Sequence, residues 1–120
     1  MSMHILVVDD DAEMRLAARF GLEKAGHRVT EAADGAAAAA LEEVPDVLLM
    51  DLLLGPHDGE DVARSLTARP GWERVPVVYL TARHDDATRA RLRADGAAGV
   101  LAKPFDPFAL PELLAAALAP

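Results

Sequence analysis

The chain has 120 residues, of which 52% are hydrophobic and 27% are charged. At this length one domain buries roughly two-thirds of the unfolded chain's surface, so the composition predicts a single globular domain and excludes wholesale disorder. The net charge of −8 opposes the phosphate backbone of nucleic acid, and we expect no direct nucleic acid binding.

The sequence contains no cysteine, which excludes disulfides, thiol nucleophiles and cysteine-based zinc sites. The first apolar run begins at Ile5, close to the start of the sequence, so we expect no signal peptide. No apolar stretch reaches the length needed to span a membrane. We therefore expect a cytoplasmic protein that does not contact the membrane.

The first predicted strand is Ile5 to Val8, which is apolar at every position, as is typical of a strand covered by helices on both faces. Residues 14–25 predict a helix, because apolar residues recur at i, i+3, i+4 and i+7. Gly26 stands where a glycine commonly ends a helix. A second strand follows at Val29 to Ala32, and the alanine run 36–40 predicts a thin second helix.

Val47 to Met50 predicts a third strand, again apolar throughout. Asp58 to Arg69 predicts a third helix, with an apolar face that includes Leu66 and with Pro70 directly after its end. Val75 to Leu80 predicts the fourth strand.

The fourth helix is predicted to end at Gly96, and Val100 to Ala102 predicts the fifth strand. The last helix follows Asp106, but its first residue stays open. Pro107 suits a first helical position, whereas Pro111 would remove a backbone donor one turn later. Five strand and helix units with short connections favour an open, doubly wound α/β fold with a mostly parallel sheet.

Ligands of such sheets bind beyond the carboxyl ends of the strands. Taken singly, the polar residues there have ordinary structural explanations, as helix caps, loop acids or a surface lysine. Taken together, they place several carboxylates, a hydroxyl and an ammonium group at one edge. They are Asp9, Asp10 and Asp11 after the first strand, Asp51 after the third, Thr81 after the fourth and Lys103 after the fifth.

Carboxylates about 5 Å apart repel by roughly 3 kcal/mol at an effective dielectric constant near 20. A cluster of oxygen ligands without histidine or cysteine suits Mg²⁺, which also accepts oxygens from a phosphate. No glycine-rich phosphate loop is present, so a phosphoryl group would enter only with a metal ion. The chemistry that fits is phosphoryl transfer onto Asp51, with Mg²⁺ and Lys103 neutralising the charge that develops.

Five segments resemble the receiver domain of two-component response regulators, in the order and at the separations of that family. The resemblance runs from about His4 to about Leu118. It implies a flavodoxin-like, CheY-like fold with five helices and the strand order 2-1-3-4-5. The segments are ILVVDDD (5–11), PDVLLMDLLL (45–54), DG (58–59), VPVVYLTA (75–82) and KPF (103–105).

The resemblance implies a role for each acid at this edge. Asp51 would accept the phosphoryl group and bind the metal ion. Asp9 and Asp10 would be the acidic pair, of which the second binds Mg²⁺ directly and the first through water. The backbone carbonyl of Leu53 would be a further ligand. Asp11 matches no fixed functional position in the family.

The phosphate contacts are implied in the same way. Thr81 would hydrogen-bond one phosphate oxygen and Lys103 would pair with another, while the Lys103–Pro104 peptide would be cis. Two positions depart from the family: Val100 stands where an aromatic residue is common, and Gly55-Pro56 reverses the usual order. With Val100 the chain lacks the aromatic side chain that, in the family, commonly turns inward upon phosphorylation and so transmits the signal to the outer surface.

The implied function is a phosphorylation switch of a two-component phosphorelay. A phosphohistidine on a sensor histidine kinase or histidine phosphotransfer protein would supply the group to Asp51 in a Mg²⁺-dependent reaction. The surface of the fourth helix, fifth strand and fifth helix would change in response. We expect no enzymatic activity beyond self-phosphotransfer and self-dephosphorylation.

Residues 1–120 are predicted to be one receiver domain with no output domain present. The chain would act on a downstream protein, or it would be a segment of a regulator whose effector domain is missing. The residues do not decide between these two arrangements.

Leu16 and Phe20 lie one turn apart and off the inward face of the first helix, so they are either a docking site for the phosphodonor or a shallow local contact. Arg83, Arg89, Arg91 and Arg93 make the fourth helix basic, either as a solvated face or as a partner surface. His84 has no second histidine at ligand spacing, and we assign it no metal.

Two other functions compete with the switch. An aspartate-based phosphatase typically has a second aspartate two residues after the nucleophile, but Leu53 occupies that position. A phosphorylation-independent interaction module with the same fold, a pseudo-receiver, would account for Val100.

Overall fold

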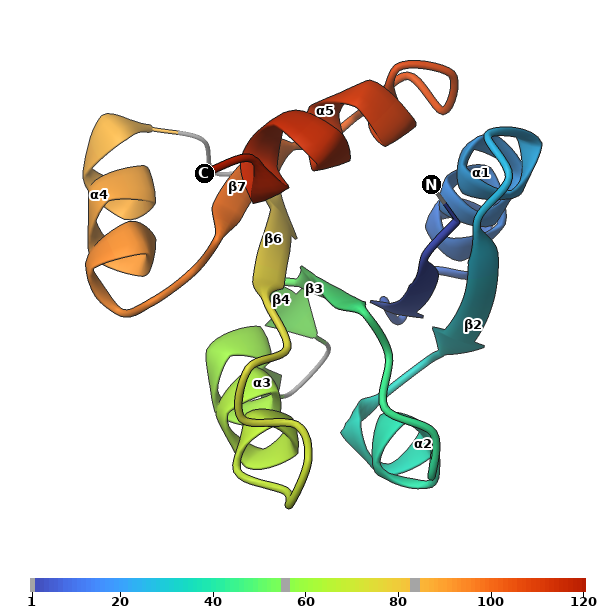
Figure 1. The fold of residues 1–120 in the computed structure, drawn as a ribbon. Helices are drawn as coiled ribbons and strands as arrows, with labels where there is room; N and C mark the ends of the chain where they lie inside the picture. The colour runs from blue at the N-terminus through green and yellow to red at the C-terminus, as the bar shows by residue number, and fades with distance from the viewer. Residues whose placement is uncertain (1, 55–56, 83–84) are drawn as a thin grey trace.

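Five parallel strands form the central sheet in the order β2-β1-β3-β6-β7 (Figure 1). This order is the predicted 2-1-3-4-5, because the structure adds a short hairpin of two strands, β4 (Leu53–Leu54) and β5 (His57–Asp58), that the sequence analysis did not anticipate. The strands of the sheet are β1 (His4–Val8), β2 (Arg28–Ala32), β3 (Val47–Asp51), β6 (Val77–Thr81) and β7 (Gly99–Ala102).

The structure is a computed structural model and describes residues 2–54, 57–82 and 85–120. The expectations for Gly55-Pro56, Arg83 and His84 fall outside the described residues.

Helices cover both faces of the sheet, as the apolar strands predict. One face packs against α1 and α5, and the other packs against α2, α3 and α4 (Figure 1). The helices are α1 (Ala12–Lys24), α2 (Gly35–Ala39), α3 (Gly59–Thr67), α4 (Asp86–Ala94) and α5 (Leu110–Leu118).

Alternate residues of β1 enter the two halves of the core. Ile5 and Val7 pack among side chains of α1 and α5, whereas Leu6 and Val8 pack among those of α2, α3 and α4. All four residues are at most 1% exposed, which explains why the strand is apolar throughout instead of alternating.

Several boundaries differ from the predicted ones for local reasons. The fourth strand begins at Val77 and not at Val75, because Pro76 has no N–H for a ladder hydrogen bond. The third helix ends at Thr67 instead of Arg69, whose N–H donates to the carbonyl of Leu66 in a turn. Gly26 and Gly96 end α1 and α4 with φ values of 97° and 100°, which confirms both predicted helix ends.

The last helix begins at Leu110, which answers the question that the two prolines left open. Asp106 caps the turn before it, since its Oδ1 accepts from the N–H of Phe108 at 2.9 Å and its carbonyl accepts from that of Leu110 at 3.0 Å. Pro111 therefore lies in the first helical turn, where a backbone N–H has no partner within the helix.

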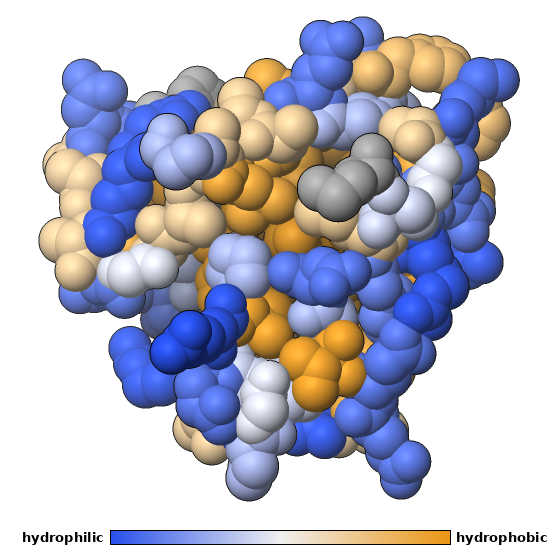
Figure 2. All heavy atoms as spheres, viewed as in Figure 1, coloured by the Kyte–Doolittle hydropathy of each residue, from blue (hydrophilic) through white to orange (hydrophobic). Residues whose placement is uncertain are grey.

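Hydrophobic atoms reach the surface in the middle of the face shown in Figure 2, and hydrophilic residues cover much of its right and lower left margins. Within the described residues, no helix has the length and apolar character that crossing a membrane requires.

Gly21 permits α1 to approach the backbone that leads into α5. A Cβ atom at this position would lie 1.9 Å from the carbonyl oxygen of Pro107. Helix propensity alone predicts that Gly21→Ala stabilises α1 by about 1 kcal/mol. We expect the clash to prevail and the free energy of unfolding, measured in urea, to fall by about 2 kcal/mol. A gain in stability would contradict this packing.

Candidate functional site

The polar edge of the sheet is built by the ends of four strands. Asp9 directly follows β1, Asp51 and Thr81 are the last residues of β3 and β6, and Lys103 directly follows β7. The strands are parallel, so these ends lie at one edge. The N–H of Lys103 donates to the carbonyl of Thr81 at 2.9 Å, which extends the ladder to the site itself.

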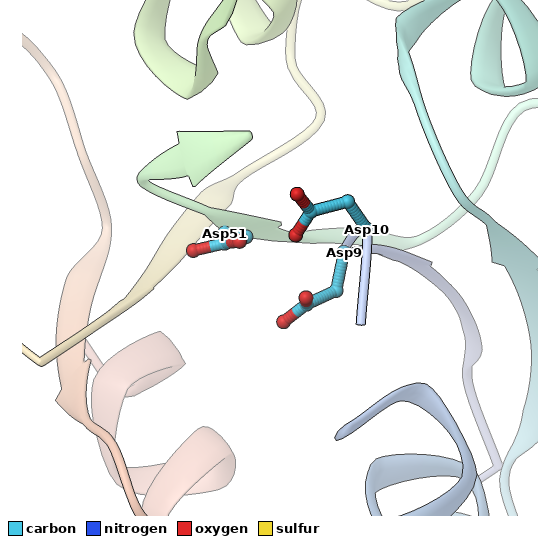
Figure 3. A group of neighbouring side chains, drawn as sticks. All are labelled: Asp9, Asp10 and Asp51. Carbon is cyan, nitrogen blue, oxygen red and sulfur yellow. The ribbon is translucent and has the colours of Figure 1, made fainter. Parts of the chain in front are cut away.

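Three carboxylates converge at this edge, as predicted. Asp9, Asp10 and Asp51 each offer an oxygen, and these oxygens all lie within 4.8 Å of one another. Figure 3 shows Asp9 and Asp10 extending from the same strand end, on the side where Asp51 lies. Asp9 and Asp51 are 1% and 5% exposed, whereas Asp10 is exposed. The site therefore has a buried acidic floor and one acid that reaches solvent.

Lys103 places its ammonium group between the two buried acids. Its Nζ donates to Oδ2 of Asp9 at 2.7 Å and lies 3.3 Å from Oδ1 of Asp51. Only 16% of the lysine side chain is exposed, so water screens these attractions weakly. One ammonium group offsets part of the charge of three carboxylates, and the remaining charge favours a further cation.

Burial and neighbouring charges shift the pKa values of Asp51 and Lys103. Burial raises the pKa of Asp51 to about 6, and the negative charge of Asp9 adds to this, while Lys103 opposes it. Burial by itself lowers the pKa of Lys103, but its hydrogen bond to Asp9 and the charges of both acids bring that pKa above its ordinary value. Lys103 is therefore charged at neutral pH.

Two hydrogen bonds, one from a backbone N–H and one from an arginine side chain, hold Asp9 in place. The N–H of Asp11 donates to Oδ1 of Asp9 at 2.9 Å, and Nη1 of Arg15 donates to the carbonyl oxygen of Asp9 at 2.8 Å. The side chain of Asp11 itself caps α1 by accepting from the N–H of Glu13, so its role is local. The contact of Arg15 with Asp9 was not predicted from the sequence, because no local pattern indicates it.

The loop after Asp51 is shaped by the Asp-Gly pair that precedes α3. The N–H of Leu53 donates to Oδ1 of Asp51 at 3.2 Å. A Cβ atom at Gly59 would lie 2.1 Å from the carbonyl oxygen of Asp51. The N–H of Gly59 donates to the carbonyl oxygen of Leu52 at 2.9 Å. Gly59 therefore allows α3 to begin against the backbone of Asp51, while Asp58 caps the helix.

The remaining predicted residues fall close to this group. Thr81 is 3% exposed at the end of β6, and the Lys103–Pro104 peptide is cis, as the resemblance implies. The side chain of Leu53 is 65% exposed at the rim.

Val100 is buried beside the site and faces Tyr79 across the β6–β7 ladder. Its carbonyl oxygen accepts a hydrogen bond from Nη1 of Arg89 at 3.1 Å. A side chain of α4 therefore reaches the strand at the position where the family commonly has an aromatic residue.

Comparisons with known proteins agree with this geometry. A family model described as the response regulator receiver domain matches residues 5–115. The chain is 36% identical to the phosphate regulon transcriptional regulatory protein PhoB of Rhizobium meliloti, over 92% of this chain and 48% of PhoB. It is 33% identical to the protein PilH of Pseudomonas aeruginosa, over 96% of this chain and 97% of PilH.

The fold matches solved structures as well. The chemotaxis response regulator CheY4 of Vibrio cholerae superposes with a TM-score of 0.87 and 28% identity, covering 98% of this chain and 100% of CheY4. The chain spans about half the length of the first curated relatives that it matches: 48% of PhoB, 44% of KdpE and 42% of ResD.

The raised pKa of Asp51 predicts how stability depends on pH. The folded-state pKa of about 6 lies above the ordinary value of 3.8, so the ionised carboxylate costs stability. This cost is absent below about pH 4 and develops as the pH rises through 6. Without metal ions, Asp51→Asn should therefore raise the free energy of unfolding by about 1 to 3 kcal/mol at pH 7.5 and leave it unchanged at pH 4.

Urea unfolding at the two pH values measures this difference. Asp61→Asn is the matched control, because the Asp61 side chain is 72% exposed on α3 and should change little at either pH. An Asp51→Asn effect of equal size at pH 4 and pH 7.5 would contradict the assigned cause.

Proposed function

The chain belongs to the response regulator receiver domain family, and from this we propose that it is the phosphoacceptor switch of a two-component phosphorelay. The observation that carries the proposal is the convergence of Asp9, Asp10 and Asp51 around one space, with Lys103 between the two buried acids. Residues 1–120 would form one receiver domain in this role.

In the proposed reaction, a carboxylate oxygen of Asp51 attacks the phosphorus of a phosphohistidine on a histidine kinase or phosphotransfer protein. The new P–O bond forms as the P–N bond breaks, and the imidazole leaves with the electron pair. The contacts from Lys103 and from the N–H of Leu53 both fall on Oδ1, which supports Oδ2 as the attacking oxygen.

The residues fit Mg²⁺, which would offset charge on the transferring phosphoryl oxygens when bound. Asp51 and the exposed Asp10 would hold it directly, together with the backbone carbonyl of Leu53. Both oxygens of Asp9 already accept hydrogen bonds, from Lys103 and from the N–H of Asp11, which supports a contact through water. Lys103 and Thr81 would each bind an oxygen of the phosphoryl group.

Phosphorylation of Asp51 would change the surface formed by α4, β7 and α5. Thr81 ends the strand that pairs with β7, and Arg89 joins α4 to the backbone of β7 at Val100. We propose that movement of Thr81 toward the phosphoryl group shifts α4 through this backbone contact. The changed surface would act on a downstream protein or on an effector segment outside this sequence.

The phosphodonor would dock on an apolar surface beside the acidic edge, formed by Leu16, Phe20 and Phe108. All three side chains are more than half exposed. The rings of Phe20 and Phe108 meet edge to face with their centroids 5.6 Å apart, which joins α1 to the turn before α5. Leu16 and Phe20 were predicted from the sequence as a possible docking site, but Phe108 was not, since nothing local in the sequence pairs it with α1.

Incubation with Mg²⁺ and acetyl phosphate tests the proposed acceptor. Intact-mass analysis should show one added phosphoryl group on the wild type and none on Asp51→Asn, because the amide is a poor nucleophile. Chelation of Mg²⁺ should also prevent the modification. Asp61→Asn is the matched control and should be modified like the wild type, since the Asp61 side chain is 72% exposed on α3 and lies outside the acidic edge.

A phosphoryl group on Asp51→Asn, or modification of the wild type after chelation, would contradict the proposal. A folded wild type that takes up no phosphoryl group would favour the phosphorylation-independent interaction module.

Paired substitutions test the docking surface. Leu16→Glu with Phe20→Glu should slow transfer from the cognate phosphodonor by at least about tenfold, because charges replace the apolar contact. Modification by acetyl phosphate should stay unchanged, which separates docking from chemistry. Val44→Glu is the control, since Val44 is also exposed but lies outside this surface. Unchanged transfer in a folded double variant would show that this surface does not dock the donor.

A further inference from the structure

An apolar groove of about 660 Å³ separates α2 from α3, on the opposite face of the sheet from the proposed docking surface. The two helices lie side by side in the structure (Figure 1). The walls are formed by Gly35, Ala36 and Ala39 of α2 and by Val62 and Leu66 of α3, with Arg69 at one end. A groove of this size and lining is in the range of small-molecule sites.

The groove exists because α2 has no side chain larger than a methyl group. Its five residues are one glycine and four alanines, so nothing from α2 reaches across to α3. At the N-terminal end the helices come close, since a Cβ atom at Gly35 would lie 3.2 Å from the methyl groups of Val62. The groove is therefore closed at the end near Asp34, which also lines it.

The other end carries a guanidinium group with an unused donor. Nη1 of Arg69 is buried and has no hydrogen-bond partner among the described residues. The guanidinium carbon lies 4.5 Å from the centre of the Trp72 ring, and the N–H of Trp72 donates to the carbonyl of Arg69 at 3.0 Å. The side chain of Ser65 lines the groove one turn before Arg69. Arg69 and Ser65 thus form a polar end that suits an anion.

We propose that this groove binds a small amphipathic carboxylate, with its apolar chain along Val62 and Leu66 and its carboxylate at Arg69. Charge sets this orientation, because Asp34 lies at the opposite, closed end. Residues 62 to 69 span about 10 Å at 1.5 Å per residue, which matches a medium-chain fatty acid. The site shares no residue with the acidic edge and does not depend on the proposed phosphoacceptor function.

Octanoate is the probe. Trp72 is the reporter, since it is the only tryptophan and its ring centre lies 4.5 Å from the Arg69 guanidinium carbon, where the carboxylate is expected to bind. Octanoate should change Trp72 emission in a saturable manner, with calorimetry giving an independent affinity. Octanol and octylammonium should bind at least about tenfold more weakly, because neither offers an anion to Arg69. Equal affinity for octanol, or no saturable binding of octanoate, would overturn the proposal.

Variants locate the site. Arg69→Met should weaken octanoate by about tenfold and change octanol by less than about twofold. Ala39→Phe should abolish binding by filling the groove. Ala37→Phe is its matched control, because Ala37 is exposed on the same helix and does not line the groove. This pair keeps the proposal testable if Arg69→Met unfolds.

Octanoate affinity unchanged by Ala39→Phe would overturn the assignment to this groove. Sedimentation tests whether a second copy of the chain occupies the groove instead. If the chain forms a dimer that Ala39→Phe dissociates and octanoate does not, another copy covers the groove. That result would also overturn the proposal. Phosphorylation of Asp51 should be the same in every variant, so either proposal can fail alone.

Discussion

The ammonium group of Lys103, held between two buried carboxylates, is the interaction on which the polar edge depends. Asp9 and Asp51 leave water almost completely, and in that environment like charges repel strongly. Lys103 touches both acids and makes their approach tolerable. One positive charge does not balance three carboxylates, so the edge retains a negative charge that would favour a hard cation. Burial, and after it the charge of Asp9, raises the pKa of Asp51 at this edge.

The parallel sheet supplies the geometry that this electrostatic arrangement requires. Four neighbouring strands end at one edge, so residues up to 94 positions apart in the chain meet without a dedicated binding loop. Two glycines then allow close backbone contacts between helices and neighbouring segments. Gly59 lets α3 begin against the carbonyl of Asp51, and Gly21 lets α1 approach the turn before α5. The contact at Gly59 is the one that places a helix directly against the backbone of an acid, Asp51.

The sheet and most of the site were predictable from the sequence, because strands buried on both faces are apolar throughout and the polar residues follow them directly. The parts that were missed depend on contacts between distant segments. No local pattern indicates that Phe108 meets Phe20 or that Arg15 holds the carbonyl of Asp9. The β4–β5 hairpin has only two residues per strand, too few to show a period. The alanine run predicted a thin helix, but the groove beside it depends on the distance to α3.

The hydrogen bond between Arg89 and Val100 has a consequence for how this chain tolerates sequence change. The acceptor is a main-chain carbonyl, which every amino acid provides, so the attachment of α4 to β7 is independent of the side chain at position 100. Substitution at position 100 would leave this hydrogen bond intact, whereas replacement of Arg89 would remove it and leave the apolar packing of α4, including Leu92, against the core.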